Sequence, residues 1–153
     1  MRAVIQRVSS ASVSVESRIL SEIKTGMVVL LGVHENDSPD DAEYLADKVA
    51  GLRIFEDEQG KMNLSSAQVN GEILAISQFT LYSDTRKGRR PGFSSAARPE
   101  KAEPLYENFM TALRERSIPV HRGQFGAMMR VSINNDGPVT IIIDSEDRHK
   151  PRR

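Results

Sequence analysis

The sequence predicts one β-rich domain of the mixed α/β class, in which several strands accompany two main helices. Three observations predict it. Short apolar stretches with a period of two, or with β-branched runs, recur along the chain. Two longer segments repeat apolar residues at helical spacing, and a length of 153 residues suits one domain. Because several strands follow one another closely, we expect hairpins and hence a mixed or antiparallel sheet.

The first half of the chain carries most of the strand patterns. Val4, Gln6 and Val8 alternate with the residues between them, and Val13 and Val15 alternate with polar neighbours. A continuous apolar run over Met27–Val33 is typical of a strand that is buried on both faces. The strands expected between residues 2 and 81 are Arg2–Val8, Ser12–Glu16, Ile19–Ile23, Met27–Val33, Leu52–Phe55 and Glu72–Leu81.

Helix signals occur twice. The first helix is expected to begin at Ser38, with proline at the next position and acids in the first turn. Residues 35–47 carry six acids and no base, which we interpret as this helix N-terminus and its solvated face rather than an acid–base site. The second helix is expected over Pro99–Arg116, with Leu105 and Phe109 on its apolar face.

The rest of the chain is read as a long loop and short strands. Tyr82–Arg98 is rich in Gly, Ser, Pro and Arg, and loops of this length tend to be functional. Beyond the second helix we expect strand material at Val120 and strands over Arg130–Ile133 and Val139–Asp144. The cluster Asn134–Pro138 between them is typical of a turn.

Composition excludes several classes of protein. The 21 Lys and Arg balance the 21 Asp and Glu, which excludes a strongly basic nucleic-acid protein at the level of totals. Because the chain has no cysteine, it has no disulfide, no thiolate zinc site and no cysteine nucleophile. Its three histidines do not form a helical metal pair, and no phosphate-binding loop or nucleophile elbow occurs. We expect a soluble cytoplasmic protein with no metal, no cofactor and no membrane segment.

The segment Ser77-Gln78-Phe79-Thr80-Leu81 breaks the pattern of its own strand. An apolar strand here acquires three polar side chains just before the long loop. One interpretation is a site, because a strand end is rigid and its free backbone N–H groups can bind an anion or oxyanion. The alternative is an edge strand whose polar side chains face water.

A second unusual segment is Asn135-Asp136-Gly137-Pro138-Val139-Thr140. A Gly-Pro step between strands usually makes a plain turn, and this reading stays open. X-Pro is also where a cis peptide bond occurs, in roughly 5–6% of such bonds in folded proteins. A cis bond would point the backbone carbonyl groups away from the strand direction. The backbone could then distinguish a small chiral group by steric contact.

Gly123-Gln124-Phe125-Gly126 has the form of the GXXG loop of an RNA-binding KH module but lacks that module's flanking helix pattern. We therefore do not assign that module. Met128 and Met129 are expected in the core, whereas an exposed Phe125 would stack on a base.

The chain resembles the D-aminoacyl-tRNA deacylase (D-Tyr-tRNA deacylase) family nearly end to end. The two unusual segments, spaced by about half the chain, carry the resemblance, and further segments support it. Those are Ala3–Val8, Arg53–Phe55, Gly60–Leu64 and Arg90-Pro91.

The resemblance implies a homodimer with a compact, barrel-like β-sheet fold flanked by helices. It implies hydrolysis of the ester that joins a D-amino acid, or glycine mischarged on tRNA, to the terminal adenosine. Gly137-Pro138, by analogy cis, would enter the active site of the partner subunit and leave no room for the side chain of an L-amino acid. Such rejection by rigid backbone explains how one enzyme accepts many D-amino acids.

The resemblance also assigns roles to residues. The catalytic segment would be Ser77, Gln78, Phe79 and Thr80, with backbone N–H groups stabilising the oxyanion and the substrate's 2′-hydroxyl assisting the reaction. Thr80 is assigned positioning rather than covalent attack, because no base near it in the sequence can be named. The residues expected to bind the substrate are Gly137, Pro138, Asn135, Arg7, Phe125, Met129 and Ala102.

Basic residues gather in two places. Arg86, Lys87, Arg89 and Arg90 lie on the long loop, where they would meet tRNA phosphates, although a solvated loop is the alternative. We expect the deacylase domain over residues 1–144 and a basic C-terminal tail over 145–153. Two rival functions stay open, a non-catalytic RNA- or DNA-binding module that uses residues 86–90 and a serine or threonine hydrolase of small esters.

Overall fold

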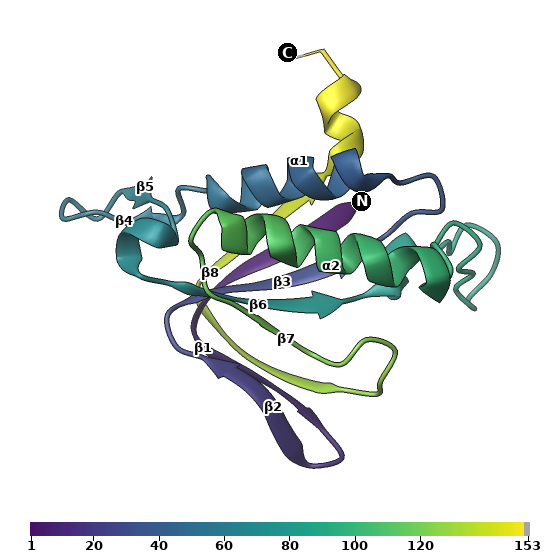
Figure 1. Ribbon diagram of the computed structural model, residues 1–153, viewed down its shortest axis with the longest axis horizontal. Coiled ribbons are helices and arrows are strands. Elements are labelled where there is room, and N and C mark those ends of the chain that lie inside the picture. Colours follow the sequence, from purple (N-terminus) through teal and green to yellow (C-terminus); the bar gives the residue numbers. More distant parts are fainter. Residues whose placement is uncertain (152–153) are drawn as a thin grey trace.

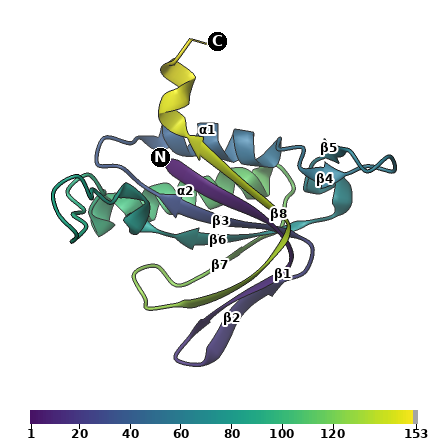
Figure 2. The same cartoon turned by 180° about the vertical axis from the view of Figure 1, so that it is seen from behind.

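A strongly curved sheet carries both helices on one of its faces in the computed structural model, which describes residues 1–151 (Figures 1 and 2). Arg152 and Arg153, the end of the predicted basic tail, lie outside the described residues. The strands are β1 (Arg2–Val15), β2 (Arg18–Ile23), β3 (Gly26–Gly32), β4 (Phe55–Glu56), β5 (Met62–Leu64), β6 (Glu72–Ser77), β7 (Val120–Arg122) and β8 (Arg130–Asp144). The helices are α1 (Pro39–Ala50) and α2 (Pro99–Glu115). The predicted mixed, β-rich, barrel-like fold is confirmed, and so are the two main helices.

The main sheet is mixed, as predicted. Its strands follow the order β2-β1-β3-β6-β7, and β8 pairs with β1. β1 is antiparallel to β2, β3 and β8, whereas β3, β6 and β7 run parallel to one another. The sheet curls because the first half of β1 pairs with β3 and its second half pairs with β2.

The curl produces two hydrophobic cores. One lies between the sheet and the helices, where Val29 and Leu31 of β3 meet the apolar faces of α1 and α2. The other lies inside the curl and contains Val28, Leu74 and Ile76. Strands β3 and β6 therefore bury both faces, which explains their continuous apolar runs.

Local chemistry fixes where the helices begin. The backbone amide of Ser38 donates to the Asp41 carboxylate at 2.8 Å, so the predicted start of α1 is confirmed.

A buried tyrosine joins α2 to the sheet. In α2, the Tyr106 hydroxyl donates to the Ala75 carbonyl of β6 at 2.7 Å. Burial raises the pKa of Tyr106 to about 12, so this phenol stays protonated and anchors α2 to the sheet.

Two predicted boundaries at the N-terminal and hairpin strands are wrong. The strands expected over Arg2–Val8 and Ser12–Glu16 are one strand, because the chain has only a register shift between Val8 and Ser10, and no turn, where the two patterns meet. The strand expected over Leu52–Phe55 is only Phe55–Glu56, since its partner β5 is short.

The turn predicted at Asn134–Pro138 is also wrong. β8 runs through this cluster, and residues 136–139 lie opposite Arg7 alone, because Gln6 pairs with Thr140 and Val8 pairs with Asn135. The turn-forming residues thus make a local bulge in one long strand and do not reverse the chain.

The chain also departs from expectation after β6. The strand predicted over Glu72–Leu81 ends at Ser77, and Phe79–Tyr82 forms a 3₁₀ turn. The loop that follows is tied down at two points, by an Asp84–Gly92 bridge and by an Ala96–His34 bridge.

The C-terminal segment that the structure describes continues beyond β8 as a 3₁₀ turn over Ser145–His149. The Ser145 amide donates to the Met1 carbonyl at 2.8 Å, and the side chain of Ser145 is buried. The division into a domain over 1–144 and a tail over 145–153 stays a prediction. Within residues 1–151, no helix combines the length and the apolar content that crossing a bilayer requires.

Candidate active site

A cavity of about 630 Å³ lies where the end of β6, the start of α2 and the loop after β7 meet. Its wall brings together six of the predicted site residues, which the sequence separates by up to 52 positions. They are Ser77, Gln78, Phe79, Ala102, Phe125 and Met129. The volume lies within the range of pockets that bind small molecules, which is several hundred cubic ångströms.

The residues at the end of β6, Ser77 and Gln78, give the cavity its polar end. The Gln78 amide donates to the Leu31 carbonyl at 2.8 Å, which extends the pairing with β3 by one residue. The backbone then turns, and Leu81 donates to the Gln78 carbonyl. The amides of Phe79 and Thr80 find no acceptor within residues 1–151, as expected for the first residues of a helical turn. Two neighbouring N–H groups are therefore available to an anion.

Thr80 adjoins the cavity but is not in its wall. Its hydroxyl accepts a hydrogen bond from the side-chain amide of Gln78. Among the described residues, the wall contains no histidine, aspartate, glutamate, lysine or tyrosine. The cavity thus offers no side chain that would act as a general base on Thr80 or on water.

Most of the other residues that line the cavity are apolar. Phe125 packs on the core beside Tyr106, with ring centroids 6.1 Å apart, and Phe79 meets Phe93 edge to face at 5.0 Å. Met129 packs against the core inside the curl. The expectation that Met128 is a core residue is wrong, because it is 91% exposed on the rim. This wall can accept a flat aromatic ring by stacking.

The second predicted segment lies elsewhere in this chain. Gly137 and Pro138 are exposed, joined by a cis peptide bond, and absent from the cavity wall. Arg7 is buried beneath them, and it donates to the Ile54 carbonyl at 2.7 Å and to the Asp136 carbonyl at 3.2 Å. The Asn135 side chain donates to the carbonyls of Arg7 and Val139, both at 3.0 Å. These contacts hold the bulge in one shape.

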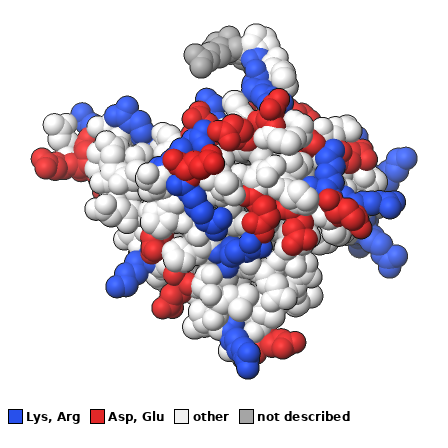
Figure 3. All heavy atoms as spheres, viewed as in Figure 1, with Lys and Arg blue, Asp and Glu red and all other residues white. Residues whose placement is uncertain are grey.

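The four bases of the long loop are exposed, and Figure 3 shows Lys and Arg gathered at the side where Figure 1 places this loop. They are Arg86, Lys87, Arg89 and Arg90. Arg86 differs from the others because it makes two side-chain hydrogen bonds to Asp84, at 2.9 and 2.7 Å. These bonds, with one from the Arg86 backbone amide, lower the pKa of Asp84 to about 2.

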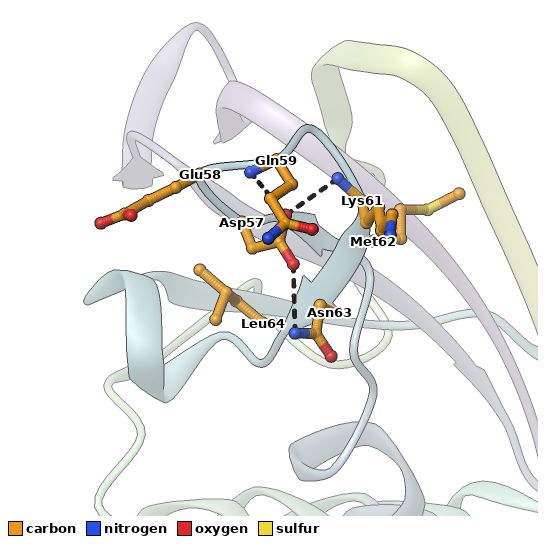
Figure 4. Close-up of a pocket in the computed structure, with 7 residues that line it drawn as sticks. All are labelled: Asp57, Glu58, Gln59, Lys61, Met62, Asn63 and Leu64. Atoms are coloured by element: carbon orange, nitrogen blue, oxygen red, sulfur yellow. Dashed lines mark hydrogen bonds between the residues drawn. The ribbon is translucent and has the colours of Figure 1, made fainter.

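A second hollow of about 680 Å³ lies along the hairpin of β4 and β5 (Figure 4). There the Asp57 carboxylate accepts hydrogen bonds from the amides of Lys61 and Gln59 and from the Asn63 side chain. The bond from Lys61 has the largest lowering effect on the pKa of Asp57. This carboxylate is occupied in closing the hairpin, and none of the predicted site residues lies here.

Some residues that line the cavity were not predicted from the sequence. Phe93 and Arg98 both lie in the long loop, and both contribute to the wall. The unusual length of the loop was the available signal, but nothing in the sequence indicated which of its residues face a cavity. Within residues 1–151, no group of three or more His, Asp or Glu residues is placed to hold a metal ion.

Comparison with known proteins decides the family. A family model described as D-Tyr-tRNA(Tyr) deacylase matches residues 4–144. The chain belongs to the D-Tyr-tRNA deacylase family. The resemblance found in the sequence is thereby confirmed. Two relatives in this family, both named D-aminoacyl-tRNA deacylase, come from Thermus aquaticus and Chloroflexus aurantiacus. The first is 59% identical over 97% of each chain, and the second is 58% identical over 100% of this chain and 96% of its own.

Two solved structures share the fold of this deacylase-family chain. One, titled c-Myc DNA Unwinding Element Binding Protein, has a TM-score of 0.89 and 44% identity, and the match covers 94% of this chain and 98% of that one. The other, titled as a probable eukaryotic D-amino acid tRNA deacylase, has a TM-score of 0.80 with the same coverage. At 16% identity, the second supports the fold alone.

Proposed function

We propose that this chain hydrolyses the ester bond of D-aminoacyl-tRNA, and of glycine mischarged on tRNA, releasing free tRNA and the amino acid in the cytoplasm. The observation that carries the proposal is the family match over residues 4–144 to enzymes named for this reaction. The cavity supports it, because an apolar wall suited to adenine adjoins a polar end with free amides. The reaction places the protein in translation quality control.

In this proposal the terminal adenosine enters the cavity and its base packs against Phe125, Met129 and Ala102. Ester hydrolysis develops negative charge on the carbonyl oxygen, and the amides of Phe79 and Thr80 stabilise it. Ser77 closes the end of the strand, and Gln78 holds the pocket or the terminal ribose. Since the wall lacks a general base among the described residues, the ribose 2′-hydroxyl of the substrate assists the attack.

Replacing Thr80 by alanine is therefore expected to leave substantial activity, within about tenfold of the wild-type rate of D-tyrosine release, since its hydroxyl positions and does not attack. Single-turnover measurement of D-tyrosine release from D-Tyr-tRNA checks this. Loss of all turnover in Thr80→Ala, with a trapped acyl-enzyme in the wild type, would support the rival threonine hydrolase.

We further propose a homodimer in which Gly137-Pro138 of one subunit enters the cavity of the other. The position of these residues supports it, because they are exposed and lie outside the cavity of their own chain. Strand β8, which carries them, pairs only with β1 among residues 1–151, and its Ile142 side chain is 67% exposed. Their backbone would exclude the side chain of an L-amino acid. Analytical ultracentrifugation of the purified protein tests the dimer, and a monomer with full activity would contradict it.

For tRNA binding we expect an ordering among the basic residues of the loop. Lys87→Ala or Arg90→Ala should each weaken binding of tRNA by a few-fold. Each should also lower the slope of log affinity against log salt concentration by about one phosphate contact. Arg86→Ala should weaken binding less, because Arg86 already neutralises Asp84. Affinity measured at several salt concentrations checks the order, and an Arg86→Ala effect as large as the other two would contradict it.

A second candidate is a non-catalytic nucleic-acid-binding module. The observation that favours it is the 44% identical structure whose title names DNA-unwinding-element binding. Incubation of the purified protein with D-Tyr-tRNA and L-Tyr-tRNA separates the two candidates. Release of D-tyrosine supports the deacylase, whereas intact RNA binding without release would support the module.

A further inference from the structure

The cavity wall contains a single ionisable residue among those that the structure describes, and it is Arg98. The other lining residues are apolar, or neutral and polar. Arg98 is exposed, and its guanidinium makes no ion pair or side-chain hydrogen bond within residues 1–151. An unpaired cation at the mouth of a neutral cavity is placed to meet an anion on the ligand.

The backbone of Arg98 is held from both sides. The buried Ala97 before it donates its amide to the Val33 carbonyl at 2.9 Å. The Arg98 carbonyl accepts from the amides of Lys101 and Ala102, at 3.0 and 2.9 Å, at the start of α2. The side chain therefore extends from a fixed point, although it contributes no bond of its own to the helix start. A change of this side chain should leave the fold intact.

We propose that Arg98 binds the phosphodiester group that links the terminal adenosine of the tRNA to the nucleotide before it. The inference rests on the proposed function and deepens it. A D-aminoacyl-adenosine end carries an α-ammonium group and no anion before the reaction, so it would not attract a guanidinium. The phosphate next to the adenosine is the nearest anion of the substrate, and arginine binds phosphate through two parallel hydrogen bonds.

An arginine at this position could instead act on the oxyanion of the transition state. The two roles differ in what the substrate must contain. A phosphate contact matters only for substrates that carry the phosphate, whereas an oxyanion contact matters for every ester. The phosphate role is favoured here because free backbone amides at Phe79 and Thr80 already adjoin the ester end.

The test compares Arg98→Ala and Arg98→Lys with the wild type on two substrates, D-Tyr-tRNA and D-tyrosyl-adenosine, which lacks the phosphate. Arg98→Ala should raise KM for D-Tyr-tRNA about tenfold with little change in kcat, and should leave hydrolysis of D-tyrosyl-adenosine unchanged. For this variant, the slope of log KM for D-Tyr-tRNA against log salt concentration should fall by about one phosphate contact. Arg98→Lys should recover part of the loss, since it keeps the charge but not the paired bonds.

Arg114→Ala is the matched control. Arg114 is exposed near the far end of α2, whereas Arg98 directly precedes this helix, so the variant removes the same charge at a distance of about 24 Å from Arg98. This variant should behave as the wild type on both substrates. An equal loss for Arg98→Ala on both substrates would overturn the proposal in favour of an oxyanion contact. No loss on either would also overturn it, while a wild-type protein inactive on both would refute the proposed function itself.

Discussion

Replacing Gly137 by alanine is expected to lower the rate of D-tyrosine release from D-Tyr-tRNA by about a hundredfold, as a displacement of roughly 1 Å in an active site can do. The added methyl carbon would lie 2.9 Å from Val139 Cγ2, 3.0 Å from Arg7 Nη2 and 3.1 Å from the Val139 amide nitrogen. Gly137 also has a φ of +122°, a conformation that side-chain-bearing residues adopt only at a cost of about 1–3 kcal/mol. The bulge must shift, and under our proposal the bulge is the part that selects the D-amino acid.

Gly60→Ala separates the selective effect from the general cost of a methyl group at positive φ. Gly60 has a φ of +73°, and a methyl carbon there would meet no atom within 4 Å. It lies in the β4–β5 hairpin, away from the cavity wall. We expect this control to lose some stability and to retain wild-type kinetics. Wild-type activity with unchanged chirality preference in Gly137→Ala would defeat the idea of a backbone selector.

The second large effect is expected from Arg7→Ala. Arg7 is 7% exposed and joins the Ile54 carbonyl to the Asp136 carbonyl, so its removal leaves a buried acceptor without a partner. We expect a loss of about 2–4 kcal/mol in the free energy of unfolding, measured by urea denaturation. Because the bulge loses the hydrogen bond from Arg7 to the Asp136 carbonyl, we also expect the rate of D-tyrosine release to fall.

Arg2→Ala provides the comparison, because Arg2 lies on the same strand and its ion pair with Asp144 is partly exposed. It should cost about 1 kcal/mol or less. An Arg7→Ala protein as stable as Arg2→Ala, with wild-type kinetics, would show that Arg7 does not hold the Gly-Pro segment.

The sequence was sufficient where local chemistry and burial act together. The Ser38 and Asp41 pattern places the start of α1 because a side chain and a backbone amide satisfy each other at that point. The run over Met27–Val33 marks a strand that is covered on both faces. The unusual segment at Ser77–Leu81 indicated a candidate site, and the structure shows that Ser77, Gln78 and Phe79 line a cavity.

The sequence was insufficient where distant partners decide the local shape. Asn134–Pro138 has turn-forming composition, yet β1 pairs on both sides of it and keeps β8 continuous. Met128 is exposed and lines the cavity, which a pattern of apolar residues does not reveal. The sequence did not single out Arg98, because the cavity that it lines is assembled from segments far apart in the chain.

The proposed function is hydrolysis of the D-aminoacyl ester with rejection of the L-form, and a single kinetic quantity distinguishes it from the alternatives. It is the ratio of kcat/KM for the purified wild-type protein on D-Tyr-tRNA and on L-Tyr-tRNA. We predict a preference for the D-form of at least about a hundredfold, because steric exclusion of one enantiomer by rigid backbone acts on binding of the transition state. Equal values for the two substrates, or no release from either, would contradict the account.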